Sequence, residues 1–246
     1  MSFRPCAIVP TYDNPMTIRS VVTAAQSHLS DVIVVDDGSG GAGRDACAQI
    51  ASEGLALVRH RECNGGKGAA VRTGFELAQE RGFTHAFQID ADGQHALERI
   101  PEFLAAAREH PEALILGYPE FDASAPRSRR VARKITNFWV NLEVGRGVIY
   151  DAMVGFRVYP LAAAAQVPVR GRRMDFDIEI AVRLAWAKVP IINLPVAVRY
   201  LSADEGGVSH FRNLRDNLRF AWLHSRLCSL KATLFFLRLF GLRRRT

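Results

Sequence analysis

Short β-rich runs alternate with segments of helical pattern through the first half of the chain. The runs are CAIVP at 6–10, DVIVVDD at 31–37, LALVRH at 55–60, THAFQID at 84–90 and ALILG at 113–117. Such alternation is typical of βαβ units, which build a mainly parallel sheet flanked by helices. We therefore expect an α/β protein whose sheet occupies roughly residues 5–118.

The second half is less regular. It holds a basic helical stretch at 128–142, the segment DAMVGFRVYP at 151–160, an acidic helix at 174–186 and a β-rich run at 189–200. No linker rich in Pro, Gly or Ser divides it, and 246 residues suit one large α/β domain. We expect one domain over residues 1–210 and a tail at 211–246.

Basic residues are concentrated in that tail. The chain has a net charge of +7; from Val208 onward nine Lys and Arg residues stand against one Asp, which gives the tail +8 and leaves the rest at −1. A neutral body with a basic tail indicates attraction to a local anionic surface and argues against a duplex nucleic acid as partner.

The tail also carries an apolar helical pattern. Its members recur at alternating spacings of 3 and 4, and they are Phe220, Leu223, Leu227, Leu230, Leu234 and Leu237. The pattern fits three arrangements: a helix lying in a membrane surface, which we favour, a helix packed on the body, and a coiled-coil seam in a homo-oligomer.

Other features suggest a cytoplasmic protein. The four cysteines are scattered without a CxxC pair, which favours reduced thiols, and the N-terminus lacks the apolar region of a signal peptide. No apolar stretch is long enough for a transmembrane span.

The segment HAFQIDADGQH at 85–95 carries the clearest chemical motif. An apolar run ends abruptly in Asp90, Asp92 and Gln94. Two carboxylates at the carboxyl end of a parallel strand can converge on a divalent cation, and oxygen ligands suit Mg²⁺ or Mn²⁺. Open α/β sheets bind ligands at this edge. Alternatively, the two Asp residues only form a turn and cap the next helix.

Three more polar segments follow predicted strands: VPTYDN at 9–14, VVDDGS at 34–39 and NGGKG at 64–68. With DADGQ, they make the sequence resemble the family 2 glycosyltransferases of the GT-A fold, in particular the polyprenyl (dolichyl) phosphate mannosyltransferase-like branch. The resemblance covers most of residues 6–210. It implies a nucleotide-binding half at about 5–118, an acceptor half at about 119–210 and a metal-dependent, inverting sugar transfer.

The resemblance also implies a donor site. The residues expected to contact the nucleotide-sugar are Pro10, Tyr12, Val35, Asp37, Lys67, Asp90, Ala91, Asp92 and His210. The Mg²⁺ or Mn²⁺ ion is expected on Asp90, Asp92 and Gln94. Lys67 would approach phosphate or sugar, although a plain helix start explains NGGKG equally well.

On the acceptor side, the resemblance assigns Asp151 and Arg157 in the segment D-x-x-x-G-F-R. Asp175, Asp177 and Glu179 are similar to the family's acidic helix, and with Asp92 they are the candidate catalytic residues. Helical spacing places Asp175 and Glu179 on one face. The alternative is an ion-paired or solvated helix face.

Two places depart from the family pattern. Mannosyltransferases of this kind carry an Arg after the fifth strand, where this chain has GYP at 117–119, and a basic loop residue where it has GVSH at 207–210. Arg129, Arg130 and Arg133 could supply the missing charge. The donor base, the sugar and the acceptor therefore stay open.

The sequence thus predicts a glycosyltransferase of cell-envelope biosynthesis, peripheral at the inner membrane face, that moves a sugar from a UDP- or GDP-sugar to a lipid-linked acceptor such as a polyprenyl phosphate. A phosphate acceptor needs no general base, whereas a hydroxyl would need one from the acidic helix. The competing functions are a sugar nucleotidyltransferase and a non-catalytic membrane-associated scaffold. The basic helix could contact lipid or a partner protein that supplies the membrane span.

Overall fold

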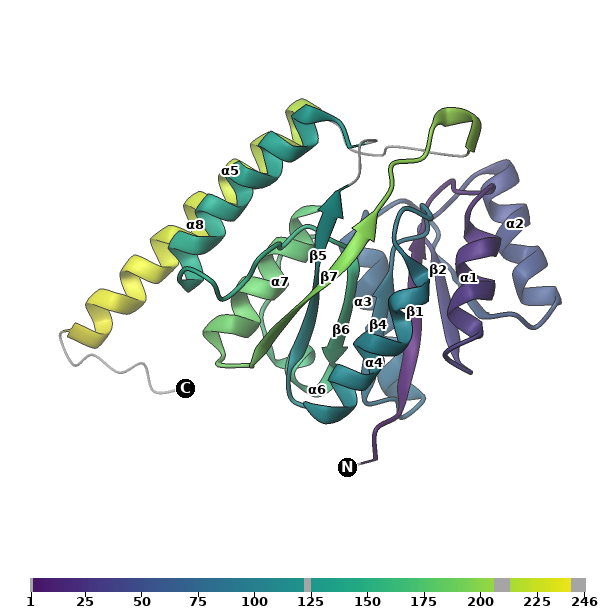
Figure 1. Ribbon diagram of the computed structural model, residues 1–246, viewed down its shortest axis with the longest axis horizontal. Helices are drawn as coiled ribbons and strands as arrows, with labels where there is room; N and C mark the ends of the chain where they lie inside the picture. Colours follow the sequence, from purple (N-terminus) through teal and green to yellow (C-terminus); the bar gives the residue numbers. More distant parts are fainter. Residues whose placement is uncertain (1, 122–124, 206–212, 240–246) are drawn as a thin grey trace.

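The computed structural model describes residues 2–121, 125–205 and 213–239 (Figure 1). Its centre is a seven-stranded sheet with the strand order β3-β2-β1-β4-β6-β5-β7. The strands are β1 (Pro5–Thr11), β2 (Val32–Asp36), β3 (Leu57–His60), β4 (His85–Ile89), β5 (Leu114–Phe121), β6 (Phe156–Pro160) and β7 (Ile191–Val198). The expected α/β sheet is confirmed.

Most strand pairs are parallel. β1 pairs in parallel with β2 and β4, β2 with β3, and β5 with β7. β6 is antiparallel to both of its neighbours, β4 and β5. The prediction that the sheet ends near residue 118 was wrong, because the second half of the chain contributes β6 and β7. All five residues of β6 are buried, including the charged Arg157. Because a charged residue is not typical of a buried strand, the sequence did not indicate that β6 lies inside the sheet.

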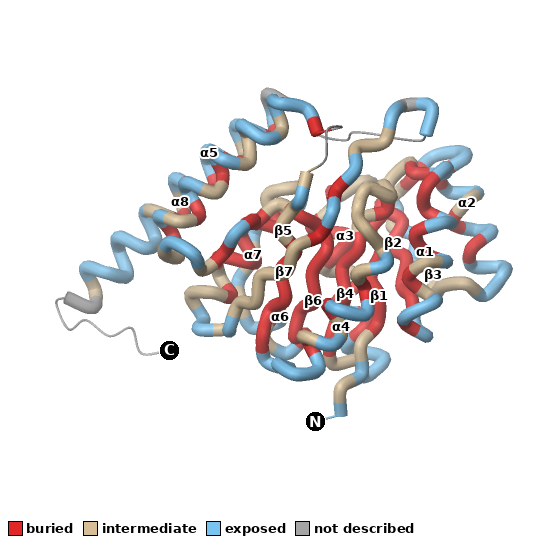
Figure 2. The backbone as a smooth tube through the Cα atoms, in the orientation of Figure 1, coloured by how far each residue is buried: buried red, intermediate tan, exposed pale blue. Residues whose placement is uncertain are grey.

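Helices cover both faces of the sheet. They are α1 (Ile18–Gln26), α2 (Gly41–Ser52), α3 (Lys67–Glu80), α4 (Ile100–Glu109), α5 (Arg127–Val144), α6 (Leu161–Gln166), α7 (Asp175–Trp186) and α8 (Asn213–Leu239), with short 3-10 turns η1 (Leu97–Arg99) and η2 (Ala203–Glu205). Buried residues concentrate on the strands and on the helix sides that face them (Figure 2).

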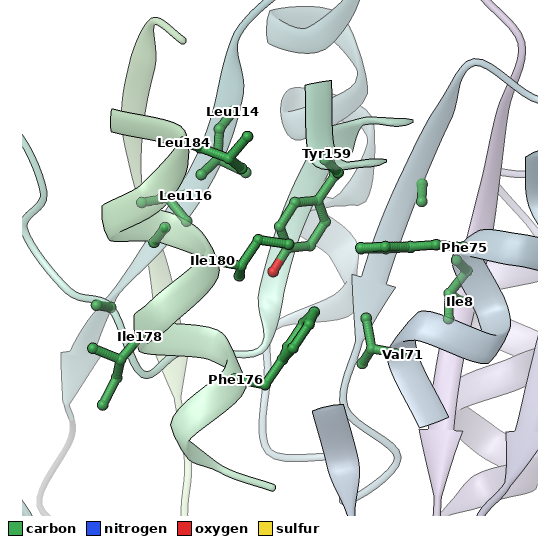
Figure 3. Close-up of a cluster of buried hydrophobic side chains, with 14 of the residues drawn as sticks. Ile8, Val71, Phe75, Leu114, Leu116, Tyr159, Phe176, Ile178, Ile180 and Leu184 are labelled. Atoms are coloured by element: carbon green, nitrogen blue, oxygen red, sulfur yellow. The ribbon is translucent and has the colours of Figure 1, made fainter. Parts of the chain in front are cut away.

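Two apolar clusters form the core. One packs α1, α2 and α4 against one face of the sheet, and the other packs α3, α7 and the first half of α8 against the opposite face. In the second cluster, Phe75 of α3 meets Tyr159 of β6 at a ring-centroid distance of 5.0 Å, and Phe176 of α7 lies beside them (Figure 3). This packing fixes α3 and α7 relative to each other.

Helices α5 and α8 lie side by side and run away from the sheet, and α8 continues past the end of α5 (Figure 1). Phe220, Leu223 and Leu227 of α8 are buried in the second cluster, so packing on the body is confirmed for this half of the predicted apolar stripe. Leu230 and Leu234, further along the same stripe, are exposed. Residues 240–246, with their three arginines, lie outside the described residues. None of the helices described is long and apolar enough to cross a membrane.

Candidate active site

Polar side chains collect at one edge of the sheet, where β1, β2 and β4 end. Tyr12, Asp37 and Asp90 come directly after these strands. A cavity of about 310 Å³ lies at this edge. The residues that line it include Pro10, Tyr12, Asn14, Asp37, Asn64, Lys67, Asp90, Ala91, Asp92, Gln94, Arg129, Arg133, Arg173, Asp177, Tyr200, Asp216, Arg219 and Phe220. The structure therefore brings together predicted donor-side residues from four separate segments, namely Pro10 and Tyr12, Asp37, Lys67, and Asp90 with Ala91 and Asp92.

The ammonium group of Lys67 joins two carboxylates from distant parts of the chain. Lys67 Nζ lies 2.7 Å from Asp90 Oδ1 and 2.7 Å from Asp177 Oδ2. Burial lowers the pKa of Lys67, but the charges of Asp177 and Asp90 outweigh it and raise the pKa above its usual value. Lys67 is thus a permanent cation that fixes the start of α3 to β4 and α7.

Asp177 is engaged at both carboxylate oxygens. Its Oδ1 accepts a hydrogen bond of 3.1 Å from Gln88 Nε2 and lies 4.0 Å from Arg157 Nη1, while Lys67 occupies Oδ2. Burial raises the pKa of Asp177, and the charges of Lys67 and Arg157 outweigh this and lower it. Asp177 therefore stays ionised at the cavity wall.

The position of Asp90 depends on Gly155. The backbone N–H of Asp90 donates to the Gly155 carbonyl at 3.2 Å. A Cβ atom on residue 155 would lie 2.1 Å from Asp90 Oδ1, far inside van der Waals contact. Gly155 is therefore the residue that leaves room for this carboxylate, and it gives a physical role to the glycine of D-x-x-x-G-F-R.

The DADGQ segment fits a divalent cation by its donor chemistry. Asp92 Oδ1 accepts the Gln94 N–H at 3.1 Å, and burial and the charge of Asp90 raise the pKa of Asp92. A cation at Asp90 and Asp92 would relieve this repulsion, and carboxylate and amide oxygens are ligands of Mg²⁺ and Mn²⁺. Across residues 2–121, 125–205 and 213–239, no three His, Cys, Asp or Glu side chains already form a metal cluster.

Asp37 holds the NGGKG loop in place. Its Oδ1 accepts the Gly65 N–H at 3.1 Å and pairs with Arg61, and its Oδ2 accepts the Gly66 N–H at 2.7 Å. Burial raises the pKa of Asp37 although these donors oppose the shift. Since Lys67 follows Gly66, the same carboxylate that lines the cavity also positions the Lys67 backbone.

Comparison with known proteins identifies this arrangement. The family model for "Glycosyl transferase family 2" matches residues 6–161, which is most of the sheet and the whole donor edge. The chain belongs to glycosyl transferase family 2. The glycosyltransferase activity expected from the resemblance is confirmed at the level of the family.

Two relatives of this family 2 glycosyltransferase have names that refer to polyprenol lipids. The undecaprenyl-phosphate mannosyltransferase of Micrococcus luteus is 28% identical over 205 residues, covering 78% of this chain and 82% of the relative. The polyprenol monophosphomannose synthase of Mycolicibacterium smegmatis is 28% identical over 231 residues, covering 87% of this chain and 83% of the relative.

Solved structures confirm the GT-A fold of this family 2 glycosyltransferase. Glucosyl-3-phosphoglycerate synthase from Mycobacterium tuberculosis, in complex with Mn²⁺ and UDP-glucose, superimposes with a TM-score of 0.66 at 17% identity, covering 99% of this chain and 81% of that chain. Mannosyl-3-phosphoglycerate synthase from Rubrobacter xylanophilus gives 0.66 at 16% identity, covering 99% and 77%. At this identity the likeness shows the fold.

Five predicted site residues do not line the cavity of this glycosyltransferase. Val35 is fully buried in the core, and Asp175 accepts the Arg173 N–H beside the cavity. Glu179 is buried among Arg183, Arg226 and the N–H of Gly171. Asp151 pairs with Arg133 at 2.6 Å, and Arg157 is buried and donates to the Val154 and Asp177 carbonyls. Their contacts hold the surrounding elements together. His210 lies outside the described residues.

The sequence interpretation did not assign the cavity residues Arg173, Tyr200, Arg219 and Phe220. Arg219 and Phe220 belong to α8, which the charge pattern assigned wholly to a tail. Asn64 is the first residue of the NGGKG motif, so that motif could have indicated Asn64 as a cavity residue. Nothing in the local sequence marks Arg173 or Tyr200, because only the packing of α7 and β7 brings them to the cavity.

Proposed function

We propose that this enzyme transfers a sugar from a nucleotide-diphospho-sugar to a polyprenyl phosphate at the cytoplasmic face of a membrane. The names of the two polyprenol-linked relatives support the acceptor class. The observation that carries the proposal is that one cavity is lined both by the carboxylates of Asp37, Asp90 and Asp92, here called the acidic wall, and by four arginines, here called the basic wall.

The acidic wall is the proposed donor side. Pro10, Tyr12 and Asp37 would contact the nucleobase, and Ala91 and Lys67 would lie along the phosphates and the sugar. Asp90, Asp92 and Gln94 would hold Mg²⁺ or Mn²⁺, which would neutralise the charge of the departing diphosphate. A divalent ion accompanies UDP-glucose in the Mycobacterium tuberculosis structure, which supports this assignment.

The basic wall is the proposed acceptor side. Arg129 and Arg133 of α5, Arg173 before α7 and Arg219 of α8 all line the same cavity. Converging guanidinium groups are suited to phosphate, because they offer planar, charge-assisted donors.

The surroundings of the acidic helix also favour a phosphate acceptor. Of the three candidate bases, only Asp177 reaches the cavity, and Lys67 and Gln88 already occupy its oxygens. An ionised phosphate oxygen can attack the anomeric carbon directly. The new bond forms between this oxygen and the carbon, the bond from that carbon to the diphosphate breaks with inversion, and the nucleoside diphosphate leaves without a proton transfer.

The test is nucleotide release from UDP- and GDP-sugars with Mg²⁺ or Mn²⁺, with polyprenyl phosphate compared with the unphosphorylated polyprenol. We expect release from one donor, stimulated by the phosphate alone, and its loss in Asp92→Asn. Equal stimulation by the polyprenol would contradict the phosphate acceptor. Pyrophosphate as product would indicate a nucleotidyltransferase, and absence of donor binding by calorimetry would contradict the donor site.

A further inference from the structure

Helix α5 presents an apolar stripe to solvent. Val131, Ile135, Phe138 and Leu142 recur at spacings of four, three and four, which places them on one side of the helix, and all four are exposed. The opposite side of α5 carries the buried residues Thr136, Val140 and Glu143. A contiguous apolar patch exposed to solvent is typical of a surface that contacts a membrane or another protein, so we expect a partner to cover the α5 apolar stripe.

Helix α8 also exposes aromatic side chains. Trp222 is 70% exposed, whereas Leu223 and Leu227 of the same helix are buried. Phe235 and Phe236 are exposed further along α8, beyond Lys231, whose Nζ donates to the Leu142 carbonyl near the end of α5. Exposed tryptophan and phenylalanine side chains are typical of helices that lie at the interface between a bilayer and water.

The charged residues of the two helices indicate what kind of partner covers their exposed apolar side chains. Arg127 and Lys134 on α5 and Arg215 and Lys231 on α8 are exposed. The acidic residues of the two helices, Glu143 and Asp216, are both buried. Cations that flank exposed apolar side chains, without exposed carboxylates, match an anionic lipid surface.

We propose that α5 and α8 together dock on an anionic lipid bilayer, with the α5 apolar stripe inserted between headgroups. The sequence pointed only to the C-terminal helix, whose first half the structure shows to be packed on the body. A second copy of the chain is a weaker fit, because a symmetric dimer would bring the same exposed cations face to face.

This docking proposal rests on the proposed function, in which the acceptor is a lipid held in the membrane. The first two turns of both helices supply Arg129, Arg133 and Arg219 to the cavity, so a docked α5–α8 pair places the basic wall beside the membrane. A lipid-linked phosphate could then reach the donor while its chain stays in the bilayer.

The experiment is cosedimentation of the full chain with phosphatidylglycerol-containing vesicles and with pure phosphatidylcholine vesicles. The variants are Phe138→Ser, the triple variant Ile135→Ser/Phe138→Ser/Leu142→Ser, and the matched control Met16→Ser, since Phe138 is 59% and Met16 64% exposed. The triple variant should bind phosphatidylglycerol vesicles at least about tenfold more weakly, because each buried apolar group adds to the membrane affinity. Met16→Ser should bind like the wild type.

Three results would overturn the proposal: no wild-type binding to anionic vesicles, equal binding by the triple variant, or a wild-type dimer that the triple variant converts to a monomer. The last would assign the stripe to a self-interface. Calorimetric measurement of donor binding without lipid separates the docking proposal from the proposed function. If only membrane docking is lost, the triple variant should bind the donor as the wild type does. If the proposed donor site is wrong, the wild type itself should not bind the donor.

Discussion

Gly155 and Asp90 fit together so closely that a single methyl group at residue 155 would overlap the carboxylate. The Cβ position lies 2.1 Å from Asp90 Oδ1 and 2.2 Å from Oδ2. Because the carboxylate is the end of a short flexible side chain, the overlap would turn Asp90 away from Lys67 and the cavity.

Gly155→Ala should therefore lower kcat/KM by about 100-fold, since displacements near 1 Å in a reacting site have costs of this order. Gly40→Ala is the matched control, because a Cβ there would meet nothing within 4 Å. The measurement is steady-state nucleotide release, with melting temperatures recorded for both variants. Full activity of Gly155→Ala would contradict a role for Asp90 at the reacting centre.

Lys67→Met should destabilise the fold by about 3–5 kcal/mol, because it leaves the buried carboxylate of Asp177 and the partly buried carboxylate of Asp90 without their shared cation. Asp177→Asn added to Lys67→Met should recover part of this loss, since it removes one of the uncompensated charges. Urea unfolding of the wild type, the two single variants and the double variant gives the coupling energy. Additive effects would show that the two residues do not interact.

The donor edge of the sheet could be predicted from the sequence because each of its motifs is local. Asp37 and Asp90 directly follow strands that are apparent from their apolar runs, and parallel strands bring their carboxyl ends to one edge. Chain order and motif alone therefore place these side chains near each other.

The other side of the cavity depends on contacts between distant segments. The pairing of Lys67 with Asp177 requires α7 to pack on α3, and Arg219 reaches the cavity only because Phe220 and Leu223 are buried against the body. The burial of Glu179 was likewise invisible, since its partner Arg226 comes from α8. A periodic pattern gives the face of a helix but not the surface that the face meets.

Arg219→Gln should raise the KM for polyprenyl phosphate by about tenfold, the effect of losing roughly one charge-assisted hydrogen bond, and should leave the donor KM unchanged. Arg215→Gln is the control, because Arg215 lies on the same helix, is exposed and does not line the cavity. Steady-state kinetics with each substrate varied in turn gives both constants. An equal effect of the two variants would indicate general attraction to the lipid rather than contact with the phosphate.

Glu179 should contribute stability that depends on pH. Its Oε1 lies 2.7 Å from both Arg183 Nε and Arg226 Nη2, and its Oε2 accepts the Gly171 N–H at 2.8 Å. Burial raises the pKa of Glu179, and the hydrogen bonds of Arg183 and Gly171 outweigh this and lower it below the ordinary 4.5. A carboxylate with a lowered pKa in the folded state stabilises above its unfolded pKa, and the contribution disappears as the pH falls through the folded pKa.

Glu179→Gln should therefore reduce the free energy of unfolding by about 3 kcal/mol at pH 7, as expected for a broken buried ion pair, and the difference from the wild type should shrink below pH 4.5. Glu53→Gln is the control, because the Glu53 pair with Arg19 is exposed and surface pairs contribute little. Urea unfolding across this pH range measures both differences. A difference that stays constant with pH would mean that Glu179 acts through its shape and hydrogen bonds, and that its charge does not anchor α8 to α7.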